Sequence, residues 1–197
     1  MRAAAASRSE SRFELEALGL QGLVAVRRQR MADERGSLSR LFCADELAAA
    51  GWDWPVAQIN HTVTLHRGAV RGFHFQRPPH AEAKLVSCLR GAVWDVAVDL
   101  RQGSPTFLQH RALELSADNG QALLIPPGFA HGFQALREGV ELLYLHSAAH
   151  APGFEGGLHP QDPALAVTWP LEVTQMSLRD RSHPFMDLSA FEGISLP

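Results

Sequence analysis

The feature that most constrains the fold of this chain is a regular rhythm of short apolar runs between Val56 and Tyr144. Turn-forming residues such as Arg-Gly, Pro-Pro, Asp-Asn-Gly and Pro-Gly interrupt these runs at intervals of about eight to twelve residues. Such runs are too short for long helices, whereas strands joined by tight turns pack into antiparallel sandwiches or barrels. The rhythm predicts an all-β architecture of antiparallel strands with a few short helices.

One segment shows the alternation that a strand with two different faces requires. Trp94, Val96 and Val98 fall on one side of an extended chain, while Asp95 and Asp99 fall on the other. We interpret the two aspartates as hydrogen-bonded structural groups that line a face of the barrel.

Turn residues predict how neighbouring strands connect. Leu85–Leu89 and Val93–Leu100 are separated by Arg90-Gly91, which predicts a hairpin. Leu123–Ile125 is expected to be a strand that runs into a tight turn at Pro126-Pro127-Gly128.

The flanking segments have a different pattern. Ala44–Ala50 predicts a short helix with Gly51 as its C-cap. Residues 148–197 are rich in proline, glycine and polar side chains and predict a mostly irregular wrap with short helical turns. We expect a single domain over residues 1–197, with a core barrel at about 30–147, a flexible arm at 1–12 and the C-terminal wrap.

Composition limits the partners and the compartment. The formal charge of −3 and the pI near 6.3 disfavour nucleic-acid binding through a broad basic surface. Cys43 and Cys88 form no CxxC spacing, which argues against a disulfide framework and favours a reducing compartment. No segment has the length of a membrane span, and polar residues after Ser7 make the start a poor signal peptide. We therefore expect a cytoplasmic protein with neither membrane nor nucleic-acid partners.

Three features carry chemistry. Arg71–Gln76 is a predicted strand in which His74 and Gln76 share a face with Gly72, whose missing side chain is expected to leave room beside the imidazole. Tyr144, the only tyrosine of the chain, places a polar tip on an apolar strand that begins at Val140.

The third feature is a histidine, His131, that with Pro126 and Gly128 forms a Pro-x-Gly-x-x-His pattern, the second-motif spacing of cupin barrels. Metal-binding cupins supply several imidazoles and a glutamate, but here the first motif offers only His74-x-Gln76, and Glu82 has no evident place as a ligand. We expect metal-free chemistry with no cofactor.

These motifs together resemble the dTDP-4-dehydrorhamnose 3,5-epimerases. The run Arg71–Gln76 resembles the RGLHxQ motif of that family. Further matching segments occur in consistent order over roughly residues 30–185: 33–36, 58–60, 79–81, 84–86, 91–101, 103–107, 115–119, 125–133, 169–170 and 177–180. A consistent order over so much of the chain is far more specific than any one tripeptide.

The resemblance implies a cupin-type jelly-roll barrel, a homodimer with strand exchange, and a dTDP-sugar substrate bound without metal. It implies an epimerase that removes a proton beside the C4 ketone of a 4-keto-6-deoxyhexose and reprotonates carbon 3, carbon 5 or both from the opposite face.

The resemblance also assigns roles to residues. It implies that His74 is the base, that Asp180 holds its tautomer and orientation, and that Tyr144 returns a proton from the other face. Lys84 and His131 would lie near the developing oxyanion. Four further positions match those that hold the diphosphate or the sugar: Arg35, Gln58, Asn60 and Arg71.

Each assignment has a structural alternative. His131 could cap a turn, and Tyr144 could be a core residue with one hydroxyl partner. Arg35 and Arg71 could form surface or interface ion pairs. The other histidines are expected to be surface or structural residues: 61, 66, 80, 110, 146, 150, 159 and 183.

The chain departs from the family pattern at four positions. His150 stands where a second tyrosine is usual, Leu145 where a lysine is frequent, Pro160 where a tryptophan is common and Ser37 where an aromatic is frequent. By analogy these positions lie near or behind the sugar or base pocket, so they bear on which carbon is deprotonated. We hypothesise a 3-epimerase, or a 3,5-epimerase with an unusual sugar.

Three other functions fit parts of the same pattern. They are a metal-dependent cupin isomerase or oxygenase, a non-catalytic sugar-nucleotide binder, and a ketoisomerase that moves the carbonyl between carbons 3 and 4. The joint presence of the four predicted catalytic residues favours catalysis over binding alone.

Overall fold

The computed structural model describes residues 11–197. Most of the arm expected at residues 1–12 lies outside these residues. No helix among residues 11–197 is both long and apolar enough to cross a lipid bilayer.

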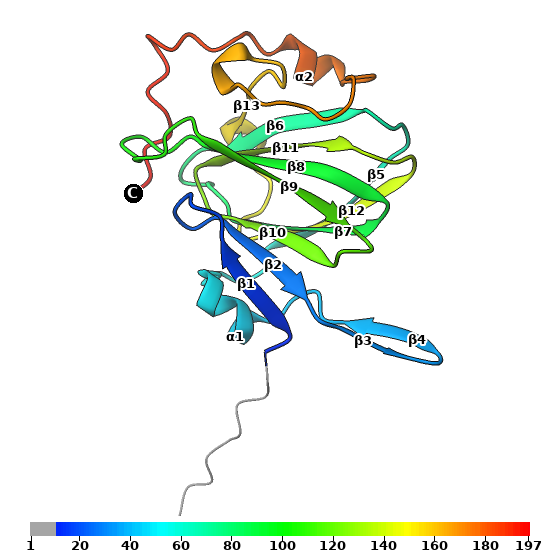
Figure 1. The fold of residues 1–197 in the computed structure, drawn as a ribbon. Helices are drawn as coiled ribbons and strands as arrows, with labels where there is room; N and C mark the ends of the chain where they lie inside the picture. The colour runs from blue at the N-terminus through cyan, green and yellow to red at the C-terminus, as the bar shows by residue number, and fades with distance from the viewer. Residues whose placement is uncertain (1–10) are drawn as a thin grey trace, which may run out of the picture.

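Two antiparallel sheets pack face to face (Figure 1). The six-stranded sheet has the strand order β1 (Phe13–Ala17), β2 (Val24–Arg28), β10 (Gln121–Ile125), β7 (Lys84–Arg90), β12 (Val140–His146) and β5 (Gln58–Thr64). The five-stranded sheet has the order β13 (Glu155–Gly157), β6 (Val70–Gln76), β11 (Phe129–Ala135), β8 (Ala92–Asp99) and β9 (His110–Ser116). This is the jelly-roll architecture predicted from the sequence, and the all-β prediction is confirmed.

Two short segments lie outside the sandwich. β3 (Arg30–Asp33) and β4 (Gly36–Ser39) form a separate hairpin that projects away from the sheets (Figure 1). The predicted helix is confirmed as α1 (Ala44–Leu47) followed by the 3₁₀ turn η1 (Ala48–Ala50), and Gly51 ends it in the left-handed conformation at φ 91°. Glycine suits this C-cap because it has no Cβ to clash.

The barrel begins earlier in the chain than predicted. β1 and β2 pair with each other, and β2 also pairs with β10, so residues 13–28 belong to the six-stranded sheet. The predicted start at about residue 30 omitted them and included β3 and β4, which lie outside the barrel.

The predicted hairpin around Arg90-Gly91 is wrong. β7 belongs to the six-stranded sheet and β8 to the five-stranded one, so the chain crosses between the sheets at this point. Gly91 has φ 75°, a value that a hairpin turn and a sandwich corner can both use. The local sequence does not distinguish the two.

Three apolar clusters stabilise the layers. One fills the interior between the sheets, and a second packs the outer face of the six-stranded sheet against Leu47 and Trp52. The third packs Val96 and Val98 of β8, with Leu100 just after that strand, beneath the C-terminal segment. Each fully buried valine, leucine, isoleucine or phenylalanine side chain in these clusters contributes about 1.5–3 kcal/mol to the stability of the fold.

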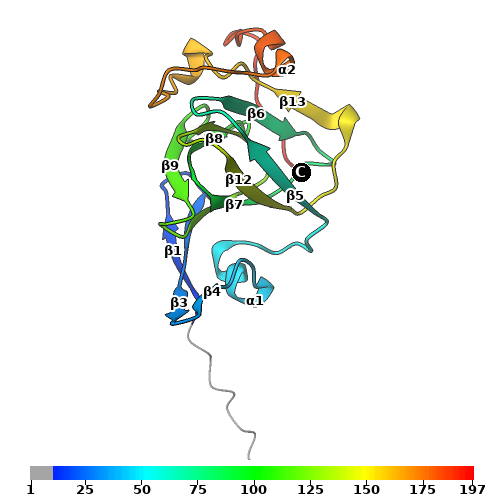
Figure 2. The same cartoon turned by 90° about the vertical axis from the view of Figure 1, so that its right-hand side faces the viewer.

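The C-terminal segment covers the five-stranded sheet from residue 148 onward (Figures 1 and 2). It contains η2 (Pro152–Phe154), β13, η3 (Pro163–Leu165) and α2 (Leu178–Ser182). Because the apolar face of β8 packs against this segment, Asp95 and Asp99 occupy the opposite face and are fully buried.

Candidate active site

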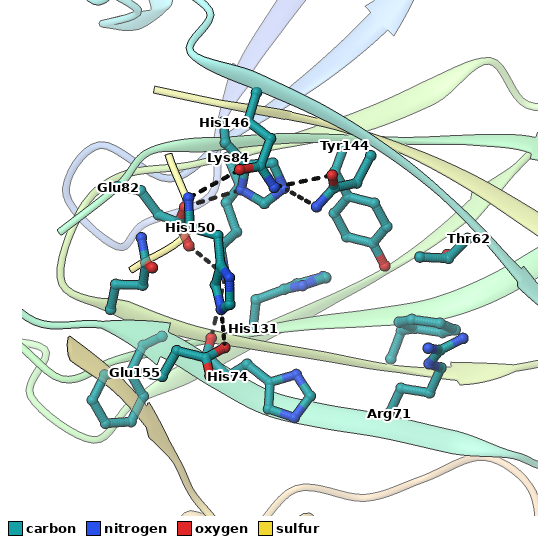
Figure 3. Close-up of a pocket in the computed structure, with 15 residues that line it drawn as sticks. Thr62, Arg71, His74, Glu82, Lys84, His131, Tyr144, His146, His150 and Glu155 are labelled. Atoms are coloured by element: carbon teal, nitrogen blue, oxygen red, sulfur yellow. Dashed lines mark hydrogen bonds and ion pairs between the residues drawn. The ribbon is translucent and has the colours of Figure 1, made fainter. Parts of the chain in front are cut away.

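A cavity of about 340 Å³ lies between the two sheets. Side chains from β5, β7 and β12 line it on one side, and side chains from β6 and β11 line it on the other (Figure 3). Seven of the nine predicted site residues line the cavity: Gln58, Asn60, Arg71, His74, Lys84, His131 and Tyr144.

His74 and Asp180 form a hydrogen-bonded pair at the cavity wall. Nε2 of His74 lies 2.7 Å from Oδ1 of Asp180, and the histidine side chain is 37% exposed while that of Asp180 is buried. The partner of Asp180 Oδ2 is the Gly72 N–H, at 3.4 Å. Since Nε2 is engaged by the carboxylate, Nδ1 is the ring nitrogen left for a bound molecule.

The position of Asp180 is set by the start of α2. The Ser177 side chain caps this helix and accepts a hydrogen bond from the Asp180 N–H at 3.0 Å. Burial by itself would raise the pKa of Asp180, but the hydrogen bonds from His74 and from the Gly72 N–H outweigh it and lower that pKa. Asp180 is therefore a carboxylate at neutral pH.

Gly72 has a different role from the one predicted. A Cβ at this position would lie 2.8 Å from the His131 carbonyl oxygen and would also meet the backbone of Gly132, so the space is taken by β11. Its φ of 127° is also one that side chains rarely adopt. Gly72 thus permits β6 and β11 to approach closely and does not leave room beside the imidazole.

A second histidine–carboxylate pair lies next to the first. His131 is the cross-strand partner of His74, and its Nε2 lies 2.9 Å and 3.0 Å from the two carboxylate oxygens of Asp95. Both side chains of this pair are buried.

Tyr144 faces the cavity from the other sheet. Its ring is T-shaped to that of His131 at 5.9 Å and stacked on that of His146 at 6.0 Å. The phenol oxygen points toward Thr62 (Figure 3). Burial, with a smaller contribution from the charge of Asp95, raises the pKa of Tyr144, so the phenol keeps its proton at neutral pH.

Lys84 belongs to a buried polar group beside Tyr144. Its Nζ lies 3.2 Å from Oε1 of Glu82 and donates to the His74 carbonyl at 3.4 Å. The other oxygen of Glu82 lies 3.0 Å from Nδ1 of His146. Burial would raise the pKa of Glu82, but His146 and Lys84 together lower it.

The remaining predicted binding residues differ in their placement. Gln58 and Asn60 are hydrogen-bonded to each other through their side chains on β5. The Arg71 guanidinium donates a hydrogen bond to the Val63 carbonyl at 3.4 Å. Arg35 does not reach the cavity of its own chain, because it lies at the tip of the β3–β4 hairpin, where it is exposed and paired with Asp33 at 2.5 Å.

Comparisons with known proteins agree with this geometry. The sequence matches the dTDP-4-dehydrorhamnose 3,5-epimerase family over residues 17–187. The chain belongs to this family.

Relatives of the chain are similar over most of their length. A dTDP-4-dehydrorhamnose 3,5-epimerase of Streptomyces griseus is 41% identical over 85% of this chain and 84% of its own. A dTDP-4-dehydrorhamnose 3-epimerase of Streptomyces niveus is 40% identical over 86% of this chain and 82% of its own. The crystal structure of NovW, a 4-keto-6-deoxy sugar epimerase from the novobiocin biosynthetic gene cluster of Streptomyces spheroides, superposes with a TM-score of 0.83 at 37% identity, covering 92% of this chain and 90% of NovW.

Membership of the 3,5-epimerase family confirms three predictions. The chain is an isomerase, its fold is that of the family, and its chemistry is epimerisation of a nucleotide-linked 4-keto-6-deoxy sugar.

Of the four departures from the 3,5-epimerase pattern, only His150 lines the cavity. Leu145 is buried in the cluster on the outer face of the six-stranded sheet, and Pro160 is buried where its carbonyl accepts a hydrogen bond from Trp169. Ser37 lies in the β3–β4 hairpin. Within a single chain, the expectation that these positions lie near or behind the pocket is therefore confirmed for His150, which lines the cavity, and for Leu145, which lies behind it on β12, and it is wrong for Ser37.

Several charged or polar cavity residues are not among the predicted site residues. The sequence indicates no place for Glu82, predicts a surface or structural role for His146 and indicates no role for Glu155. His146 follows Tyr144 by two residues on one strand, so the period-two rule places both on the same face and could have identified it. His150, also expected to be surface or structural, pairs with Glu155 at 3.0 Å across the cavity (Figure 3).

The donor set does not fit a cupin metal centre. Gln76 uses its side chain to bond His80, Ala149 and Ala151 of the neighbouring loops. His131 and Glu82 are likewise engaged by protein partners. Within the described range 11–197, no three His, Cys, Asp or Glu side chains are arranged to hold a metal ion.

Proposed function

We propose that the protein inverts the configuration at carbon 3, carbon 5 or both of a dTDP-linked 4-keto-6-deoxyhexose, with His74 as the base and Tyr144 as the acid. The observation that carries this proposal is that both side chains line one cavity from opposite sheets. Inversion needs a proton to leave one face of a carbon and return to the other, and two groups on opposite walls meet that need.

The chemistry begins at a carbon beside the C4 ketone. His74 Nδ1 takes the proton from carbon 3 or carbon 5, and the electron pair moves onto the ketone oxygen as an enolate. The Asp180 carboxylate holds the Nε2–H and stabilises the imidazolium that forms. The Lys84 ammonium, held beside the His74 carbonyl, stabilises the oxyanion.

The second half returns a proton to the opposite face. The Tyr144 O–H donates to the same carbon as the enolate collapses back to the ketone. Its raised pKa makes the phenol the protonated form before the step. The proton on His74 and the one that Tyr144 needs are then exchanged through water, which restores both groups.

Substrate binding is assigned to the polar residues around the cavity. Arg71, Gln58 and Asn60 line it and offer donors suited to a diphosphate or a sugar. An epimerase of Legionella pneumophila, 35% identical to this chain, has been solved with dTDP-4-keto-L-rhamnose. This similarity supports a dTDP-sugar as the ligand.

Arg35 contributes to binding through a homodimer in this proposal. The hairpin that carries it exposes Leu38 and Met31, and the edge strand β5 exposes Ile59 and Val63. Exposed apolar groups beside an unpaired strand edge favour association with a second copy. The hairpin of one copy would then bring Arg35 to the cavity of the other.

The proposed location is the cytoplasm. Cys43 and Cys88 are both free thiols, which is the usual state of cysteines in a reducing compartment.

In this proposal, His150 influences which carbons of the sugar are inverted. Relatives of nearly equal identity are named both 3,5-epimerase and 3-epimerase, so identity alone favours neither. His150 is the one departure that lines the cavity, and its bond to Glu155 spans it. We propose that this pair limits the change of ring pose that inversion at both carbons requires, which favours carbon 3.

The decisive experiment is proton NMR of dTDP-4-keto-6-deoxy-D-glucose incubated with the enzyme in D₂O. Wild type should exchange deuterium into carbon 3, and His74→Ala should exchange roughly 10²- to 10⁴-fold more slowly. Tyr144→Phe should still exchange, but with retained configuration, because His74 can return the proton to the face from which it came. His66→Ala, an exposed histidine outside the cavity, is the matched control.

Other outcomes have clear meanings. Equal exchange at carbon 5 would overturn the preference for carbon 3. Appearance of a 3-keto product would indicate a ketoisomerase. Binding without exchange would contradict the epimerase proposal for this substrate.

A further inference from the structure

A continuous chain of hydrogen bonds links the loop after β12 to the buried carboxylate beside Lys84. The His150 N–H donates to Gln58 Oε1 at 2.9 Å, and Gln58 Nε2 donates to Asn60 Oδ1 at 3.0 Å. Asn60 Nδ2 lies 3.4 Å from His146 Nε2, and His146 Nδ1 lies 3.0 Å from Glu82 Oε2. All five side chains line the cavity.

The direction of every bond follows from the first one. A backbone N–H can only donate, so Gln58 must present its oxygen to His150 and its NH₂ to Asn60. Asn60 then accepts with its oxygen, and its NH₂ faces His146. The nitrogen of His146 that meets this NH₂ must accept, so the ring carries its proton on Nδ1 and donates it to Glu82.

This arrangement determines the surroundings of Lys84. One oxygen of Glu82 is occupied by the His146 N–H, and the other faces Lys84 Nζ at 3.2 Å. A second Lys84 donor meets the His74 carbonyl at 3.4 Å. The Lys84 ammonium has three N–H groups, so one is left to point into the cavity, which Lys84 and Glu82 both line.

We propose that His146 is a positioning residue for Lys84 and acts through Glu82. It does not take or give the reacting proton. The neutral ring, fixed by the chain from His150, holds Glu82 in the orientation that aims the remaining Lys84 N–H at the substrate oxygen. The catalytic consequence rests on the proposed function, whereas the protonation of the ring does not.

The first test examines the ring itself. NMR of protein labelled with ¹⁵N-histidine should show His146 as the neutral Nδ1–H tautomer at neutral pH, with the signal assigned by its loss in His146→Asn. A ring protonated on Nε2, or on both nitrogens, would overturn the inference even if the enzyme is fully active.

The second test separates positioning from folding and from substrate binding. His146→Leu should lower kcat about 10- to 100-fold because misplaced catalytic groups are costly, while KM changes by less than roughly threefold. His146→Asn, which keeps a donor near the place of Nδ1, should recover most of kcat. Unchanged kcat in His146→Leu, or no recovery with asparagine, contradicts the inference.

The third test asks whether His146 acts through Lys84. In a Lys84→Met background, adding His146→Leu should lower kcat no further, because residues that act as a unit are not additive. Multiplicative effects would overturn the inference. If His146→Leu does not fold, Glu82→Gln tests the same link, since it also removes the carboxylate that holds Lys84, and it should be equally silent in the Lys84→Met background. Absence of wild-type turnover would instead contradict the proposed function.

Discussion

Two histidine–carboxylate pairs lie side by side on neighbouring strands, and they differ in what they leave free. His74 pairs with Asp180 through one carboxylate oxygen and keeps a partly exposed ring at the cavity. His131 faces both oxygens of Asp95 and is almost fully buried. The same two functional groups therefore differ in their consequences: an accessible ring nitrogen suits proton transfer, whereas a buried pair is costly to break by removing one partner.

The origin of the carboxylate explains the difference. Asp95 lies on β8, beside β11 within the same sheet, so the His131 pair is built into the ladder. Asp180 comes from α2 in the C-terminal segment, which covers the outer face of the sheet (Figure 1) and leaves the His74 side chain partly exposed at the cavity. The C-terminal segment thus completes the base.

The largest effect that separates the two pairs is expected from Asp180→Asn. This change removes the charge that stabilises the His74 imidazolium and should slow deuterium exchange about 10²- to 10⁴-fold. The free energy of unfolding should change much less. Exchange at the wild-type rate in this variant would mean that His74 does not depend on Asp180.

Asp95→Asn should have the opposite effect: a large loss of stability and a small change in the rate of deuterium exchange. It leaves His131 without its buried charged partner and should lower the free energy of unfolding by about 3 kcal/mol. Urea denaturation measures this loss of stability. The rate of deuterium exchange into the substrate, at a temperature where the variant is folded, measures the effect on catalysis, which should be small. A stable variant with strongly reduced exchange would assign catalysis to the second pair as well.

Gly72→Ala probes the contact that brings the two strands together. Its Cβ would lie 2.8 Å from the His131 carbonyl oxygen, and φ 127° is strained for alanine, so we expect a loss of about 1–3 kcal/mol. Thermal unfolding beside Gly36→Ala, where φ is similarly 136° but nothing lies within 4 Å, isolates the contribution of the contact. Equal losses in the two variants would show that the contact between the added Cβ and the backbone of β11 contributes nothing to the loss of stability.

The smallest effect concerns acid stability. The pKa of Asp180 is lowered in the folded protein, so its stabilisation is present above the unfolded pKa of about 3.9 and is lost as pH falls toward the folded pKa. Between pH 5 and pH 3, the free energy of unfolding should therefore fall less steeply in Asp180→Asn than in wild type. Identical slopes in urea titrations would show that the first pair adds no pH-dependent stability.

The sequence by itself determined the local features of this protein. Period-two alternation identified β8, short extended segments between turns identified β6 and β12, and a short segment ended by Gly51 identified α1 with η1. Motif order identified the family, and with it seven residues that the cavity brings together. These features depend on neighbours along the chain, which a sequence displays directly.

Only the tertiary structure decided which segments meet. Gly91 turns the chain between sheets rather than within one, and the C-terminal segment makes the polar face of β8 the inner one. Glu82 and His146, 64 residues apart, become one group beside Lys84. Pairing between distant strands depends on the total burial and hydrogen bonding of the whole sandwich, so the local pattern, which is the same for either choice of partner, could not have specified it.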